Sequence, residues 1–87
     1  MSDMDQSLVT RIVEAALMAA NQPLTVVQLN GLFPLDEPAP EGSIATALAE
    51  LQAACAERGV ELVEVASGWR FQIQEDVHPW VARLWTE

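Results

Sequence analysis

Side chains that commonly catalyse reactions or hold metals are few in this sequence. It has one histidine, His78, with no partner nucleophile beside it, and one cysteine, Cys55. A zinc site needs about four ligands, mostly of these two types, and an internal disulfide needs a second cysteine. The four glycines stand far apart, so the chain has no glycine-rich phosphate loop. We therefore expect no catalytic residue, no metal and no cofactor, in a protein that is not an enzyme.

The charge argues against nucleic acid as the main ligand. The chain carries 13 acidic residues against four basic ones, for a formal net charge of −9. DNA binding draws its sequence-independent affinity from Lys and Arg side chains that neutralise phosphates. All four basic residues are arginines, and they are scattered along the chain at Arg11, Arg58, Arg70 and Arg83. A basic patch would have to assemble in space, and we expect no direct, specific nucleic-acid partner.

The length of 87 residues allows one small domain. The N-terminus is acidic, unlike a signal peptide, and no apolar run approaches the roughly 18 residues of a membrane span. We expect a flexible tail over residues 1–6 and a single folded domain over residues 7–87. The predicted location is the cytoplasm, with no membrane partner.

Three helices are predicted in the first two thirds of the chain, over residues 7–20, 26–33 and 43–57. Thr25 and Gln28 have capping-box spacing at the start of the second helix. The core residues expected on that helix are Val27, Leu29, Leu32 and Phe33. A proline-rich loop over residues 34–42 leads to the third helix, whose apolar residues recur at helical spacing. Gly59 is the residue expected to end it.

A hairpin and a final helix complete the pattern. Residues 60–65 and 69–73 read as two strands, with Trp69, Phe71 and Ile73 alternating with polar residues. The turn between them would form a wing at Ser67, Gly68 and Arg70, and a final helix would begin at residues 75–76. This order predicts an α+β, mostly helical fold: a winged helix-turn-helix with three helices, a two-stranded wing hairpin and a C-terminal helix.

The third helix would enter the DNA major groove in a nucleic-acid-binding winged helix. Base readout needs Arg, Lys, Asn or Gln on its outer side. That side instead offers small and acidic residues: Thr46, Ala49, Glu50, Ala53 and Glu57. Phosphates would repel the carboxylates of Glu50 and Glu57. The pattern is more typical of a protein-interaction module.

The first helix carries more apolar surface than one buried stripe requires. Two neighbouring rows are apolar, one including Leu8 and Ile12 and the other including Val9 and Val13. Either the hairpin and last helix cover the second row within the chain, or another molecule covers it. Both explanations remain open from the sequence.

Several segments, in their order and spacing, resemble one family. They are residues 12–17 (IVEAAL), 22–25 (QPLT), 47–51 (ALAEL), 58–65 (RGVELVEV), 68–72 (GWRFQ) and 79–81 (PWV). Over residues 8–85 the chain is similar to the N-terminal winged-helix domain of segregation and condensation protein B. That family has two tandem winged helices, so the second is expected to be absent here. Trp69 stands where the family leads us to expect tyrosine.

The resemblance implies a non-enzymatic scaffold subunit of a bacterial SMC–kleisin complex. It would form a homodimer and bind the kleisin, segregation and condensation protein A, and through it SMC, supporting chromosome condensation and segregation. The complex would associate the protein with the nucleoid. We expect the dimer or partner interface to include apolar residues of the first helix and one near the C-terminus: Leu8, Val9, Ile12, Val13 and Trp85.

Two alternatives remain. One is a winged-helix DNA-binding transcription regulator, which would bind duplex DNA with an affinity that falls steeply with salt. The other is an unrelated acidic protein-interaction adaptor.

Overall fold

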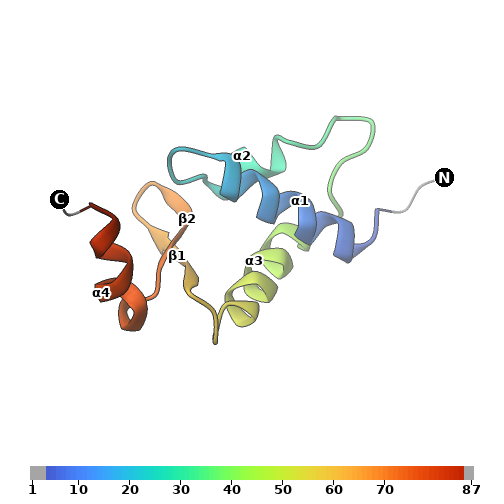
Figure 1. Cartoon of the computed structure of the whole chain (residues 1–87). Coiled ribbons are helices and arrows are strands. Elements are labelled where there is room, and N and C mark those ends of the chain that lie inside the picture. The colour runs from blue at the N-terminus through green and yellow to red at the C-terminus, as the bar shows by residue number, and fades with distance from the viewer. Residues whose placement is uncertain (1–3, 86–87) are drawn as a thin grey trace.

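The computed structural model describes residues 4–85 and has the predicted winged-helix architecture, in which a helical layer carries a small hairpin at one end (Figure 1). Residues 1–3 of the predicted tail lie outside that range. The body consists of α1 (Gln6–Ala19), α2 (Val26–Asn30), α3 (Ser43–Ala54), β1 (Val60–Val65) and β2 (Gly68–Ile73). A C-terminal arm follows, made of η1 (Glu75–Val77), α4 (His78–Val81) and η2 (Ala82–Trp85).

The first helix packs against α3 and the hairpin to form the core. Asp5 caps its N-terminus by accepting a hydrogen bond from the Leu8 amide at 2.9 Å. Met4 lies half-buried against the core, so the folded part begins before residue 7. The core is a contiguous cluster of apolar side chains: Val9, Val13, Leu17, Leu29, Phe33, Ile44, Ala47, Leu48, Leu51 and Leu62.

The predicted capping box starts α2. The Thr25 hydroxyl accepts the Gln28 amide at 3.1 Å, while the Gln28 side chain accepts the Thr25 amide at 2.8 Å. The helix ends at Asn30, three residues before the predicted end, and Leu32 and Phe33 continue in turns. Val27 and Leu32 are exposed, so their assignment to the core was wrong. A helix this short presents only one apolar position, Leu29, to the core.

The third helix ends at Ala54 rather than at residue 57, because a side chain from beyond the hairpin terminates it. The Gln74 amide donates to the Cys55 carbonyl at 3.0 Å and to the Val60 carbonyl at 3.2 Å. Its backbone N–H also donates to the Gly59 carbonyl at 2.9 Å. Gly59 therefore lies in a turn tied to Gln74, and it does not adopt the left-handed conformation expected of a helix-ending glycine.

The hairpin has the predicted strands, paired antiparallel with Leu62 opposite Phe71 on the face toward the core. A one-residue bridge joins Trp69 of β2 to Leu24, through hydrogen bonds of 2.9 Å and 2.7 Å between their backbones. Gly68, at φ 135°, makes this approach possible. A Cβ at that position would lie 2.5 Å from the Leu24 carbonyl carbon and oxygen.

The predicted final helix begins at Glu75 and is divided into three short helical segments, η1, α4 and η2. Pro79 lies in the first turn of α4, where a proline is tolerated because its missing N–H would have no helical partner there. The chain forms a single α-helical turn between two 3-10 turns. The arm lies beyond the hairpin, at the end of the molecule opposite the N-terminus, and the molecule measures 53 × 23 × 20 Å (Figure 1).

Candidate functional site

The residues most able to carry chemistry lie apart. His78 is exposed in the arm with its ring 6.2 Å from that of Trp85, while Cys55 is buried at the end of α3. Within residues 4–85, no cluster of three or more His, Cys, Asp or Glu side chains could hold a metal ion. None of the helices in that range is long and apolar enough to cross a membrane.

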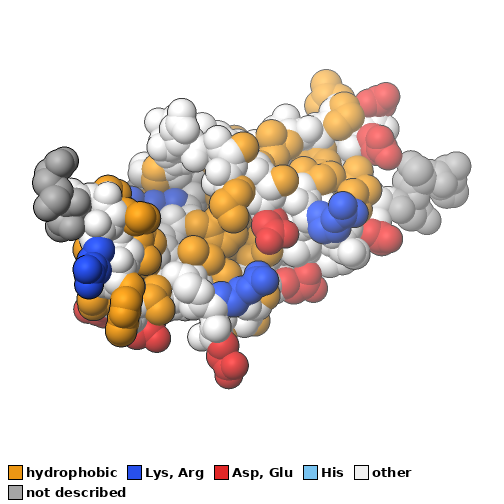
Figure 2. Space-filling model, viewed as in Figure 1, with side chains coloured by type: hydrophobic (Ala, Val, Ile, Leu, Met, Phe, Trp, Pro, Cys, Tyr) orange, Lys and Arg blue, Asp and Glu red, His pale blue; other side chains and the backbone are white. Residues whose placement is uncertain are grey.

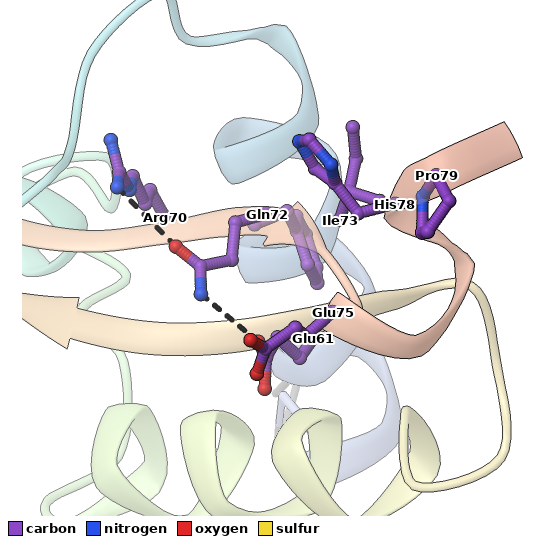
Figure 3. A pocket seen from close by; sticks show the side chains of 8 residues that line it. Glu61, Arg70, Gln72, Ile73, Glu75, His78 and Pro79 are labelled. Carbon is purple, nitrogen blue, oxygen red and sulfur yellow. Dashed lines mark hydrogen bonds between the residues drawn. The ribbon is translucent and has the colours of Figure 1, made fainter. Parts of the chain in front are cut away.

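Of the predicted wing residues, Gly68 packs within the fold and Arg70 belongs to a chain of side-chain hydrogen bonds across the hairpin. Arg70 donates to the Gln72 side chain at 3.3 Å, and Gln72 donates to Glu61 at 2.9 Å (Figure 3). These side chains line an open pocket between the hairpin and the start of the arm. Gly68 is buried against Leu24, and only Ser67 at the tip is exposed without such a role.

The outer side of α3 is exposed and carries no basic residue. Thr46, Ala49 and Ala53 are open to solvent, and Glu50 accepts a hydrogen bond from the Thr10 hydroxyl at 2.8 Å. Glu57 lies beyond the helix end. This surface offers a phosphate backbone one carboxylate and no cation, so α3 lacks the chemistry of a DNA-recognition helix.

The outer side of α1 carries a shallow apolar groove, which we call the α1 groove. Exposed or half-exposed apolar side chains form its floor and two charged residues flank it: Leu8, Arg11, Ile12, Glu14, Ala15 and Met18. Figure 2 shows hydrophobic side chains gathered over this part of the molecule, next to charged ones. Within residues 4–85 no other segment buries this groove, so it remains available to another molecule.

The predicted interface residues divide between this groove and the core. Leu8 and Ile12 line the groove, whereas Val9 and Val13 are 0% exposed and face the interior. The assignment of Val9 and Val13 to the interface was wrong, because the row that they form with Leu17 is the one that packs on α3. Ala15 and Met18 extend the Leu8–Ile12 row by helical spacing, a signal already present in the sequence.

A second group of exposed apolar side chains lies on the C-terminal arm. Trp85, predicted at the interface, is exposed, and so are Trp80 and Leu84. Trp80 and Leu84 share helical spacing with Val77 and Val81, which are half-buried. The chain therefore leaves two separate apolar surfaces open, the α1 groove and the arm.

Comparison with known proteins identifies the family. The family described as segregation and condensation complex subunit ScpB matches residues 11–87. The chain belongs to this family. It is 47% identical over 74 residues to a segregation and condensation protein B homolog of Coxiella burnetii, an alignment that covers 85% of this chain and 35% of that protein. The chain thus spans about a third of the length of this ScpB relative.

Solved structures share the fold. The crystal structure of ScpB from Mycobacterium tuberculosis matches 97% of this chain and 51% of its own, with a TM-score of 0.80 and 23% identity. A crystal structure described as a dimer of ScpB N-terminal domain complexed with ScpA peptide matches 90% of this chain and 95% of its own. Its TM-score is 0.75 and its identity is 28%. Both the predicted family resemblance and the winged-helix fold are confirmed.

Proposed function

We propose that this ScpB-family domain is a non-enzymatic scaffold that forms a homodimer and binds the kleisin ScpA. Through the kleisin it would join an SMC complex and support chromosome condensation and segregation. The observation that carries the proposal is the uncovered α1 groove, in a chain 28% identical to an ScpB N-terminal domain crystallised as a dimer with an ScpA peptide.

The groove supports dimerisation on energetic grounds. Burying apolar surface is favourable by roughly 25 cal/mol per Å². A small domain has little interior in which to hide such surface, and a contiguous exposed patch is typical of an interaction site. Leu8, Ile12 and Met18 form such a patch on one rigid helix, which a second copy can cover without refolding.

The charge supports a protein partner over DNA. A net charge of −9 repels phosphates, and the outer side of α3 provides no cation to attract them. An acidic domain with exposed apolar side chains binds other proteins by burying those side chains and by pairing its carboxylates with basic residues of the partner.

The first test is light scattering on the purified chain across a dilution series. A mass near 19 kDa, twice the 9.5 kDa chain, is expected at high concentration, and Met18→Glu should lower it toward that of a monomer. Leu35→Glu is the matched control, because Leu35 is 100% exposed on the 34–42 loop, outside the groove. Calorimetric titration with an ScpA peptide tests the kleisin half. A monomer at every concentration contradicts the proposed homodimer. A titration that releases or absorbs no heat contradicts the proposed binding of ScpA.

A further inference from the structure

The C-terminal arm lacks substantial packing against the body of its own chain. Among the described residues, α4 packs chiefly on the two turns that flank it, η1 and η2. Trp80 is 71% exposed, Leu84 is 80% exposed and Trp85 is 64% exposed. Large aromatic side chains so open to water are typical of binding surfaces, where tryptophan is enriched among the residues that contribute most to affinity.

The arm does not reach the α1 groove of its own chain. It lies beyond the hairpin, whereas α1 runs from the far end of the molecule toward the hairpin (Figure 1). The body of the chain stands between the arm and the Leu8 end of the groove, along the 53 Å length of the molecule. Figure 2 shows the hydrophobic side chains of the arm and those over α1 as separate groups.

We infer that the arm of each copy packs into the α1 groove of a second copy. The exchange is reciprocal, so one two-fold axis relates the two contacts and both apolar surfaces of both chains become covered. This inference rests on the proposed homodimer and names its interface: Trp80, Leu84 and Trp85 of one copy against Leu8, Ile12 and Met18 of the other.

The area exposed by the two arms supplies most of what a stable dimer needs. A tryptophan side chain buries about 150–250 Å² when fully covered. At the exposures of Trp80 and Trp85, the tryptophans of two arms offer roughly 400–700 Å². The grooves that cover them lose a comparable area, which gives a total of roughly 800–1,400 Å², before Leu84 is counted. Stable interfaces bury about 1,200–2,000 Å² in total, so the arms supply most of one.

The chemistry of the groove rim fits an indole. Arg11 and Glu14 flank the apolar floor. A guanidinium stacks favourably on the face of a tryptophan ring, and a carboxylate accepts a hydrogen bond from its ring N–H. The rim thus offers one favourable contact to the face of an arm tryptophan and another to its ring nitrogen.

A complementation experiment tests the exchange. Trp80→Glu damages the arm and leaves the groove intact, whereas Met18→Glu damages the groove and leaves the arm intact. Each change affects both contacts of a homodimer, so each variant alone should dimerise at least about 30-fold more weakly in sedimentation equilibrium. A mixture of the two variants retains one undamaged contact, and it should form heterodimers more tightly than either variant self-associates. Leu35→Glu should behave like the unchanged chain.

The outcomes separate this inference from the proposed function. If the unchanged chain and Trp80→Glu dimerise equally while Met18→Glu is monomeric, the α1 grooves contact each other directly. The exchange is then overturned and the homodimer stands. Absence of heterodimers in the mixture also overturns the exchange. A monomeric unchanged chain overturns both. Circular dichroism of each variant confirms that a loss of dimer is not a loss of fold.

Discussion

Gly68→Ala is expected to destabilise the domain strongly, because the added methyl group meets backbone rather than a movable side chain. The Cβ would lie 2.5 Å from the Leu24 carbonyl carbon and oxygen and 2.9 Å from its nitrogen. The backbone at φ 135° is also unfavourable for any residue with a Cβ. The alanine therefore both strains the turn and pushes Leu24 away from Trp69.

The magnitude follows from these two costs. Holding a non-glycine residue in such a conformation costs about 1–3 kcal/mol. Displacing Leu24 removes the two hydrogen bonds of the Leu24–Trp69 bridge, worth about 1 kcal/mol each. The expected loss is about 3–5 kcal/mol, which is a large share of the roughly 4–13 kcal/mol that a domain of this length has.

Urea unfolding followed by far-ultraviolet circular dichroism measures this loss, at one fixed chain concentration because dimerisation would change the apparent stability. Two glycines are internal controls. A Cβ on Gly59 meets no atom within 4 Å, so Gly59→Ala should change stability by less than about 0.5 kcal/mol. Gly42 has φ 79° and open space around an added Cβ, so Gly42→Ala should lower the free energy of unfolding by only about 1 kcal/mol. A Gly68→Ala chain as stable as Gly59→Ala would refute the steric argument.

Three further predictions concern the core, a tertiary cap and the charge. Val13→Glu should unfold the chain at room temperature, because Val13 is 0% exposed, whereas Met18→Glu should retain a helical circular dichroism spectrum. Gln74→Glu should cost about 2–3 kcal/mol in urea unfolding, since a carboxylate would face the Cys55 and Val60 carbonyls in place of a donor. Dimerisation should strengthen as salt rises from about 50 to about 500 mM in sedimentation equilibrium, because screening weakens the repulsion between two chains of charge −9. Weaker dimerisation at high salt would instead indicate attraction between opposite charges across the interface.

Local rules predicted the parts of the fold that depend on neighbours in sequence. Thr25 and Gln28 form the expected capping box because both of its hydrogen bonds lie within four residues. The strand boundaries follow from alternation around Gly68 in the same way. The end of α3 could not be predicted, because Gln74 terminates it from 19 residues beyond Cys55. The helix propensities of residues 55–59 carry no information about that contact.

The candidate site shows a similar division. Helical spacing separates the Leu8–Ile12 row from the Val9–Val13 row, but both rows are equally apolar. Only the packing of α3 decides that Val9 and Val13 are buried and that the other row is left open. The sequence also leaves open whether Trp80 is buried. Its apolar character is compatible with a buried or an exposed position, and only the placement of the arm decides that it is 71% exposed.

The Leu24–Trp69 bridge also has a consequence for how the chain folds. It closes a loop of 45 residues (69 minus 24), which costs about 3 kcal/mol of chain entropy for roughly 2 kcal/mol of hydrogen bonding. The bridge therefore cannot form before the α1–α3 core and the hairpin hold Leu24 and Trp69 close together. We expect it to be absent from the folding transition state, so that damage to it accelerates unfolding and leaves the folding rate nearly unchanged. A contact made last in this way sets how long the domain stays folded rather than how quickly it folds.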